Sequence, residues 1–458
     1  MTDRRVRIGR TLRVWRLTAR NAVRFVAHRG RRRVTPRNRR AVLDDAFALR
    51  TADDVARELG NMKGALMKAG QLVSFVVEAL PENAQQALSS LYADAPPMSA
   101  ELAASVVRNE FGRPPESVFL DWSRVPAAAA SVGQVHRAVT RDGRHVAVKV
   151  QYPGVGAAIE SDLANADVLY RMLAAFSLKG LDTKALVEEL RLRMRDELDY
   201  RIESRNIHTF RDQFAGHPFV SLPDVLDDHS GTTVITTEWV DGLSWNEFVA
   251  QSTPESRRRA GESIWRFAQH AIHRLGVFNG DPHPGNYRFS PGGDVTFLDF
   301  GLVKRWQPGE WERLAPSMDA IIVHRDPDQL VLAMEDAGFL RVGHGLAADA
   351  VYDYVSSPYR PYLDESFTFT RAFMRDTVQR IIDVKGPHAA VIEQIDLPAS
   401  FVMLDRVVWG VSALLGKLEL AAPWRSMLLE YRLEAPPATP MGHEERAWWH
   451  GRQRAHKA

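Results

Sequence analysis

Residues Val277 to Gly301 read VFNGDPHPGNYRFSPGGDVTFLDFG, and they place two carboxylates and one amide on two short loops. Asp281 and Asn286 stand five residues apart in the first loop, and Asp299 opens the second. A hairpin-like segment joins the loops, and its apolar run from Val295 to Leu298 predicts a strand. Carboxylate and amide oxygens are the donors that hold the metal ions of a bound nucleotide. The stretch therefore predicts a phosphoryl-transfer site.

The order of these three residues matches that of protein kinases, in which an Asp is followed by an Asn and then by Asp-Phe-Gly. It predicts that Asp281 orients the acceptor hydroxyl or a water molecule, and that Asn286 and Asp299 ligate Mg²⁺. The alternative is a pair of ordinary turns, because DPHPGN is rich in turn-forming residues. The spacing, the order and the flanking strand together favour the kinase interpretation, with an amphipathic helix predicted just before it at Glu262 to Leu275.

Composition sets the outer limits on fold and chemistry. The 458 residues suffice for about three domains of ~150 residues or for one large two-lobed enzyme. There is no cysteine, which excludes disulfides, thiolate zinc sites and cysteine nucleophiles. No run of about 18 uninterrupted apolar residues occurs, so we expect no transmembrane helix. The most apolar candidate, Phe401 to Leu420, contains Asp405, Arg406 and Lys417, and its periodicity predicts a buried amphipathic helix.

Charge is distributed unevenly along the chain. Residues 1–40 carry fifteen Arg and a single acidic residue, Asp3, for a net charge of +14. Because the whole chain has a formal net charge of +2, the remaining 418 residues sum to −12. Apolar residues such as Trp15 and Phe25 alternate with these arginines at helical spacing. The N-terminus is therefore predicted to be a basic amphipathic arm on an acidic body.

Such an arm has several possible partners. An anionic membrane surface suits Arg and Trp on an amphipathic segment. Nucleic acid is the rival polyanion, a targeting peptide has a similar composition, and a solvated arm without a partner remains an alternative. We expect a cytoplasmic protein with peripheral contact to the inner membrane surface through the arm, and we disfavour nucleic acid.

The segment 41–115 has helical periodicity. Thr51 is a plausible N-cap, and Pro81 ends the first predicted helix. Further helices are predicted at Glu82 to Tyr92 and at Ala100 to Phe111. The first helix contains Lys68-Ala69-Gly70-Gln71, and its internal glycine suggests close approach to another element.

The pattern changes to short strands after Val118. A strand, a small-residue loop within VPAAAASVGQVHRAV and a second strand are followed by a hairpin turn at Asp142-Gly143. Lys149 then lies inside the apolar strand HVAVKV. A buried ammonium group is costly unless it is paired, so Lys149 is expected to meet a carboxylate or a phosphate.

The partner of Lys149 is expected on a helix from Asp182 to about Phe210. Its acidic residues leave two candidates, Glu203 as first choice and Glu197 as second. Downstream, Thr232 to Val240 predicts a strand that runs into a connection between two lobes. Backbone groups there, at Glu238 and Val240, are expected to bind an adenine edge.

These elements predict an α+β chain with a two-lobed protein-kinase-like fold, an N-terminal helical extension and a mostly helical C-lobe. The expected boundaries are 1–40 for the basic arm, 41–115 for the helical extension, 116–240 for the N-lobe, 241–434 for the C-lobe and 435–458 for a polar tail. His273 and His283 are expected to be core or loop histidines rather than metal ligands, since no second ligand stands at the right spacing.

Over roughly residues 45 to 310 the chain resembles the UbiB/ADCK family of atypical protein-kinase-like proteins, because five motifs occur in the order that the family has. They are Lys68-x-Gly70-Gln71, the alanine-rich AAAASVGQ from Ala127 to Gln134, the lysine of VAVK, Glu197-x-Asp199, and DPHPGN with DFG. One departure is Asn279-Gly280, which stands where the family commonly has His-Ala and predicts a looser catalytic loop.

The resemblance implies roles beyond those that spacing suggests. It implies that Ala128, Ala129, Ala130 and Ser131 replace the glycine-rich phosphate loop, and that Lys149 pairs with Glu203. It further implies that Lys68 and Gln71 gate the site beside Glu197 and Asp199. Family members resemble ATPases or small-molecule kinases linked to isoprenoid quinone and lipid metabolism.

The first function hypothesis is an ATP-binding, Mg²⁺-dependent atypical kinase or ATPase, in which Lys149 holds the α- and β-phosphates. Under this hypothesis the enzyme supports isoprenoid quinone or lipid metabolism at a membrane surface. The second hypothesis is a nucleotide-switched lipid-binding or chaperone-like protein that does not transfer a phosphoryl group productively. A third, a phosphotransferase similar to aminoglycoside kinases, is disfavoured by the Lys68 motif and the alanine-rich loop.

Overall fold

The structure is a computed structural model that describes residues 98–130, 132–156, 195–383, 386–396 and 399–457. Nearly all of these residues belong to one compact unit, Ser99–Pro153 with Leu173–Ala458. The basic arm, the Lys68 motif, Ser131 and most of the N-terminal half of the helix predicted from Asp182 lie outside the described residues.

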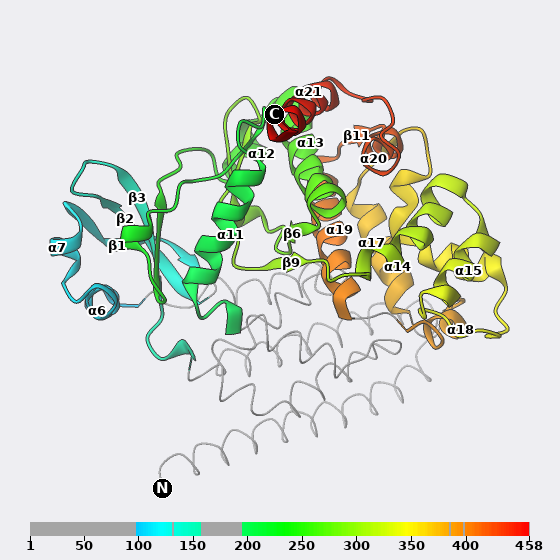
Figure 1. Cartoon of the computed structure of the whole chain (residues 1–458), viewed down its shortest axis with the longest axis horizontal. Helices are drawn as coiled ribbons and strands as arrows, with labels where there is room; N and C mark the ends of the chain where they lie inside the picture. Colours follow the sequence, from blue (N-terminus) through cyan, green and yellow to red (C-terminus); the bar gives the residue numbers. More distant parts are fainter. Residues whose placement is uncertain (1–97, 131, 157–194, 384–385, 397–398, 458) are drawn as a thin grey trace, which may run out of the picture. The chain divides into compact units, whose positions relative to one another are not determined.

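The N-lobe is built on a four-stranded antiparallel sheet in the order β1-β2-β3-β5. Its strands are β1 (Asp121–Ala130), β2 (Gly133–Val139), β3 (His145–Gln151) and β5 (Val234–Glu238). Alternation in HVAVKV sends Val146, Val148 and Val150 into the core, where all three are fully buried. The predicted turn at Asp142-Gly143 joins β2 to β3, with Gly143 at a φ of 87°. Helices α6 (Ala100–Phe111) and α7 (Pro115–Val118) pack beside this sheet (Figure 1).

The alanine-rich segment differs from the prediction. It was expected to form a loop, but Ala127–Ala130 continue β1, and Ala128, Ala129 and Ala130 pair with Val135, Gln134 and Gly133 of β2. Alanine side chains are small enough to allow this pairing at the strand end, and Gly133 allows close approach because a Cβ there would overlap the carbonyl oxygen of Val150. The turn between the two strands is therefore short.

The helix predicted from Asp182 to about Phe210 is interrupted before Glu203: Arg195 and Asp196 are helical, Glu197 and Leu198 form a turn, and a new helix begins at Tyr200. Helix α11 (Tyr200–Gln213) starts after Asp199, whose side chain accepts a hydrogen bond from the backbone N–H of Arg201. Asp199 is thus an N-cap, and its preference for that position ends the preceding turn. Glu197 and Asp199 precede the helix rather than lying within it.

Two pairs of short strands set the loops of the site side by side. β6 (Val277–Asn279) pairs with β9 (Val303–Arg305), and β7 (Tyr287–Phe289) pairs with β8 (Val295–Phe297). The predicted hairpin and strand are confirmed, and β4 (Val220–Ser221) adds a parallel edge to β8. The predicted helix before the loops is also confirmed, as α13 (Pro254–His270) followed by a π-helical turn at Ala271–Leu275.

The rest of the C-lobe is mainly helical, as Figure 1 shows for α14 to α20, and of these helices α19 and α20 pack on α13. Its remaining elements are α12 (Trp245–Gln251), α14 (Glu310–Asp319), the π-helical turn Ala320–His324, α15 (Pro327–Asp336), α16 (Ala348–Val355), β10 (Phe367–Thr368), α17 (Arg371–Ile382), α18 (Ala389–Ile392), α19 (Ala399–Leu418), β11 (Ala421–Ala422) and α20 (Trp424–Arg432), with 3-10 turns at Asp227–His229, Pro284–Asn286 and Ser357–Tyr362. The buried amphipathic helix predicted at Phe401 to Leu420 is confirmed as α19. Within the described ranges, no helix is long and apolar enough to cross a membrane.

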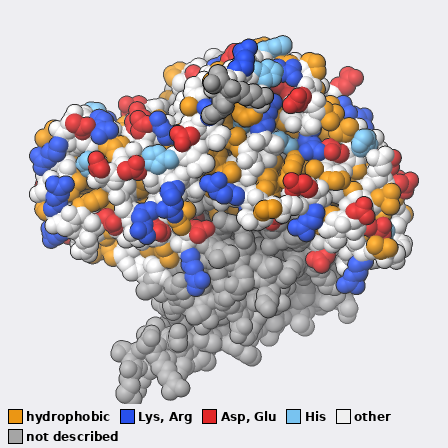
Figure 2. All heavy atoms as spheres, viewed as in Figure 1, with side chains coloured by type: hydrophobic (Ala, Val, Ile, Leu, Met, Phe, Trp, Pro, Cys, Tyr) orange, Lys and Arg blue, Asp and Glu red, His pale blue; other side chains and the backbone are white. Residues whose placement is uncertain are grey.

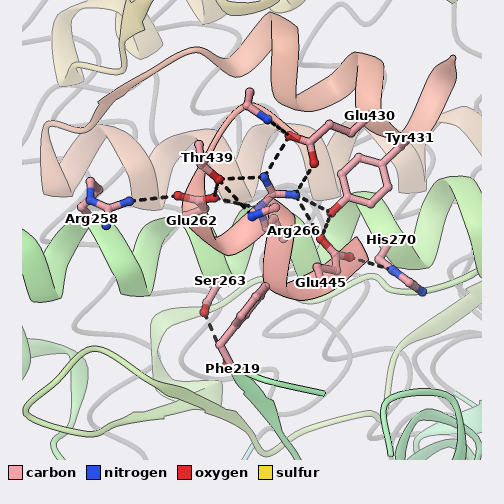
Figure 3. Close-up of polar contacts among 12 residues, drawn as sticks. Phe219, Arg258, Glu262, Ser263, Arg266, His270, Glu430, Tyr431, Thr439 and Glu445 are labelled. Atoms are coloured by element: carbon pink, nitrogen blue, oxygen red, sulfur yellow. Dashed lines mark hydrogen bonds and ion pairs between the residues drawn. The ribbon is translucent and has the colours of Figure 1, made fainter. Parts of the chain in front are cut away.

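The segment expected to be a polar tail contains a docked helix. Helix α21 (Pro440–Lys457) places Glu445 against α13, where its carboxylate contacts Arg266 at 3.0 Å and His270 at 2.8 Å (Figure 3). Arg266 also pairs with Glu430 of α20 and with Glu262 of its own helix. All four charged side chains are buried. The charged composition of the segment suggested solvent exposure, but one of its carboxylates, Glu445, is buried in this network.

Candidate active site

Lys149 of β3, Glu203 of α11 and Asp299 of the second loop come together although they are far apart in the sequence. The Lys149 ammonium donates to both oxygens of Glu203 at 2.9 Å and to Oδ2 of Asp299 at 3.0 Å. The Lys149 side chain is 16% exposed and that of Glu203 is 7% exposed. The carboxylate expected for the buried lysine is thus found, and Glu203, the first choice, is the partner of Lys149, rather than Glu197.

Charge and burial oppose each other in this cluster. Burial alone would lower the pKa of Lys149, but Asp299 and Glu203 raise it well above its usual value. Burial raises the pKa of Glu203 to about 7 even though Lys149 acts in the opposite direction. Burial also opposes ionisation of Asp299, but the Lys149 charge and the Gly301 amide hold the pKa of Asp299 below its usual value. The site therefore keeps a cation and at least one carboxylate ionised at neutral pH.

The first loop carries Asp281 and Asn286 in direct contact. The Asn286 Nδ2 donates to Oδ2 of Asp281 at 2.9 Å and to its backbone carbonyl at 3.1 Å. The backbone of Asn286 also accepts a hydrogen bond from the Leu298 amide, which ties this loop to the one that carries Asp299. The Nδ1 of His283 accepts from the Gly285 amide, and burial lowers the pKa of this imidazole. The two loops thus form one hydrogen-bonded unit.

Asn279 and Gly280 connect the catalytic loop to the segment that carries Asp299. Asn279 donates to the backbone carbonyl of Asp299 at 2.7 Å and accepts from the Asp281 amide at 2.9 Å. The Gly280 amide donates to the Leu302 carbonyl at 2.7 Å. A Cβ on Gly280 would lie 2.8 Å from Cε of Met403, so a larger residue there would displace the flexible end of the Met403 side chain. The expectation of a looser loop than His-Ala would give stays a prediction, and the long-range partners of Asn279 were not visible in the sequence.

Arg406 is a site residue that the sequence did not reveal. Its guanidinium forms an ion pair with Oδ1 of Asp281, and its Nε donates to the Gly280 carbonyl at 2.7 Å. The Arg406 side chain is 7% exposed and that of Asp281 is 16% exposed. From the sequence, Arg406 was recognised only as one of the charged residues that interrupt the apolar run Phe401 to Leu420. Its separation from Asp281 by 125 residues left no local signal.

The aromatic residue of Asp-Phe-Gly anchors the second loop. Phe300 is fully buried and lies against Phe210 of α11, with 4.8 Å between the ring centroids. Asn206 of the same helix donates to the Phe300 carbonyl at 3.0 Å. The helix that presents Glu203 is therefore fixed to the loop that presents Asp299.

The other predicted residues lie around this centre or outside the described part. Glu238 ends β5 and is exposed, and Val240 follows it, half-buried. Ala128 and Ala129 are exposed on β1. Glu197 is buried, and the Asp199 carboxylate pairs with Arg201. Lys68, Gln71 and Ser131 lie outside the described residues, so their predicted gating and phosphate-binding roles stay predictions.

Comparison with known proteins gives a consistent picture. Two relatives are the chloroplastic proteins ACTIVITY OF BC1 COMPLEX KINASE 1 and 8 of Arabidopsis thaliana. The first is 34% identical over 255 residues, covering 54% of this chain and 36% of the relative, and the second is 32% identical over 281 residues, covering 60% and 37%. The chain spans roughly a third to a half of the length of the curated relatives it matches first.

A solved structure also matches. The Rv3197–erythromycin complex from Mycobacterium tuberculosis is 32% identical in sequence, with a TM-score of 0.59 over 81% of this chain and 93% of that chain. The fold is therefore that of a kinase-like α+β protein with two lobes. The model of the ABC1 atypical kinase-like domain matches residues 90–334, more than half of the sequence. The chain belongs to the ABC1 atypical kinase-like family, the family that its UbiB/ADCK motifs predicted.

Proposed function

We propose that this chain binds ATP with Mg²⁺ at the cluster of Lys149, Glu203 and Asp299, and acts as an atypical kinase or ATPase. The observation that carries the proposal is the three-way contact of these side chains, at 2.9 to 3.0 Å, between β3, α11 and the Asp-Phe-Gly loop. A lysine held by a helix carboxylate is the arrangement that positions nucleotide phosphates in kinases.

The residues present fit the proposed cofactors. Mg²⁺ commonly takes one or two protein carboxylates and completes its coordination with phosphates and water. Asp299 supplies a carboxylate that is ionised at neutral pH, and Asn286 supplies an amide oxygen because its nitrogen is engaged by Asp281. Lys149 supplies a buried cation for the phosphates.

Each residue has a separate role in this proposal. Bound MgATP supplies the transferable γ-phosphoryl group. Lys149 binds phosphate oxygens, and Glu203 holds its ammonium in place. Asn286 and Asp299 hold metal, while Asp281 orients the acceptor hydroxyl or water. Backbone groups at Glu238 and Val240, and the end of β1 at Ala130, line the nucleotide.

We further propose that the substrate is connected with isoprenoid quinone or lipid metabolism at a membrane surface. The support is the family membership together with the charge of +14 on residues 1–40, which suits an anionic lipid surface. The acceptor of the phosphoryl group is then a lipid-like molecule or water.

The test is ATP hydrolysis by the purified full chain with Mg²⁺, with and without anionic liposomes. Wild type is compared with Asp299→Asn and with a chain that lacks residues 1–40. We expect activity that is lost in Asp299→Asn and that rises with liposomes only when residues 1–40 are present. Activity that persists in Asp299→Asn would reject the site.

A second candidate is a nucleotide-switched protein that binds an apolar ligand without productive transfer. It is favoured by the hydrogen bonds that engage both carboxylate oxygens of Asp281, and by the erythromycin complex of the similar Mycobacterium tuberculosis protein. Binding of lipid or macrolide that requires ATP and persists in Asp281→Asn would support this candidate. Loss of that binding together with hydrolysis would support the first.

A further inference from the structure

One face of α19 lies against the catalytic loop. Met403, Arg406 and Gly410 follow each other at spacings of three and four, so they share one side of the helix. Met403 packs on Gly280, Arg406 contacts Asp281, and a Cβ on Gly410 would overlap the ring of Pro282. Three consecutive loop residues are therefore each matched by one residue of this helix.

Arg406 is the polar member of this face, and it holds two different groups. The Arg406 guanidinium contacts the Asp281 carboxylate, and the Arg406 Nε donates to the carbonyl of Gly280, the residue that precedes Asp281. The guanidinium is thus bound both to the functional side chain and to the backbone that carries it. Because Arg406 is buried, water competes weakly for these contacts.

Other groups also lie near Asp281. Asn286 is neutral and binds the other carboxylate oxygen. His283 lies near Asp281 and Lys417, and burial favours its neutral form. Asp299 carries a like charge, and its cation partner Lys149 is engaged with Glu203. Tyr287, also close to Asp281, is buried and un-ionised at neutral pH.

We propose that Arg406 is a positioning residue for the reaction, which holds the Asp281 carboxylate and its loop in the orientation that catalysis requires. The inference rests on the proposed function, in which Asp281 orients the acceptor. Arg406 acts through Asp281 and does not contact the nucleotide. Its loss should therefore reduce the rate of the chemical step and leave nucleotide binding almost unchanged.

The experiment measures steady-state MgATP turnover of the full chain in wild type, Arg406→Gln, Arg406→Lys, Asp281→Asn and the Arg406→Gln/Asp281→Asn double variant. We expect Arg406→Gln to lower kcat by about tenfold or more, with KM for ATP and the Kd of MgATP within about twofold. Arg406→Lys keeps the buried charge and should recover part of the rate. On the Asp281→Asn background, Arg406→Gln should add less than about twofold, because the two residues act as a unit.

Amide hydrogen exchange of residues 279–287 in the nucleotide-free protein supplies a readout that does not depend on activity. Protection should fall in Arg406→Gln and be partly kept in Arg406→Lys. Arg380→Gln, which removes an exposed arginine paired with Asp353, is the matched control and should change neither readout. If Arg406→Gln does not fold, Arg406→Lys is used in its place, with kcat compared in the wild-type and Asp281→Asn backgrounds and with the protection of residues 279–287 compared with wild type.

Two results would overturn the positioning role. One is equal loss of kcat from Arg406→Gln in the wild-type and Asp281→Asn backgrounds, and the other is unchanged protection of residues 279–287. If wild type binds MgATP without any turnover, the proposed chemistry fails, and Arg406 is then judged by hydrogen exchange alone.

Discussion

At the scale of single residues, Asn279 connects the two loops of the site. Its side chain joins the Asp281 amide to the Asp299 carbonyl. Asn279→Ala removes both hydrogen bonds and should destabilise the fold by about 1–3 kcal/mol, because partly buried backbone groups lose their partners. ATP turnover should fall with it. Denaturant unfolding measures the change in stability and an ATP assay measures turnover, with Asn246→Ala, at an exposed position, as the control. Equal stability of the Asn279→Ala and Asn246→Ala variants would show that the two Asn279 hydrogen bonds do not stabilise the fold.

Residue identities in the site were largely predictable, whereas some contacts were not. Asp281, Asn286 and Asp299 lie within one short stretch in a diagnostic order, and Lys149 was conspicuous because a charge interrupts an apolar strand. Periodicity left Glu203 and Glu197 open, since both lie on or beside one predicted helix. Arg406 could not be found, because its partner lies on a distant loop and a charged residue on an amphipathic helix is ordinary.

At the scale of elements, the end of β1 forms one wall of the proposed nucleotide site. Ala130 pairs with Gly133, and its side chain disfavours positive φ; in the proposed function this keeps the strand end further from the phosphates of ATP than a glycine would allow. Ala130→Gly should change nucleotide affinity and raise turnover, at a cost of about 0.5–1 kcal/mol in strand stability. Ala127→Gly carries the same cost on the same strand and is the control. Nucleotide titration and turnover that match wild type in Ala130→Gly would reject this role for the strand end.

Helix α21 is held by a buried carboxylate whose ionisation is linked to folding. Contacts with His270 and Arg266 lower the pKa of Glu445 to about 2, from 4.5, against the effect of burial. A carboxyl with a depressed folded-state pKa stabilises the fold above pH 4.5 and loses this contribution as pH falls through that value towards 2.

Glu445→Gln should remove this stabilisation at neutral pH and flatten the pH dependence of unfolding below about pH 5. Urea denaturation from pH 7 down to about pH 2 measures it, with the neighbouring exposed Glu444→Gln as matched control. An identical pH dependence in wild type and Glu445→Gln would show that Glu445 is not buried as an ion.

Elements were predictable where local patterns were strong. The alternation in β3 and the 3.6-residue period in α13 and α19 predicted these elements correctly, because each segment buries one side. The interpretation of 435–458 as a tail failed for a physical reason: the Glu445 carboxylate is paired with Arg266 and hydrogen-bonded to His270 of another helix, and only this tertiary contact makes its burial favourable (Figure 3).

At the scale of the whole molecule, charge separates the N-terminal residues from the rest. Basic and acidic side chains are intermixed on the face of the described residues that Figure 2 shows, whereas residues 1–40 are almost purely basic. Arg31→Gln/Arg32→Gln/Arg33→Gln should weaken binding to anionic vesicles about a hundredfold, at about 1 kcal/mol for each arginine.

The matched control removes three exposed arginines of α17, by Arg371→Gln/Arg375→Gln/Arg380→Gln, and has the same net charge. Vesicle sedimentation at low and high salt measures both variants, and rising salt should weaken the wild-type interaction. Equal losses in the two variants would show that net charge alone, rather than the arm, determines binding.

The central claim is that Lys149, Glu203 and Asp299 form a site for MgATP, and calorimetric titration of the full chain with MgATP tests it most directly. We expect wild type to bind MgATP, Asp299→Asn to bind it at least about tenfold more weakly with little dependence on Mg²⁺, and the exposed Asp294→Asn to match wild type. Equal affinity and equal Mg²⁺ dependence in wild type and Asp299→Asn, or no binding by wild type, would contradict the claim.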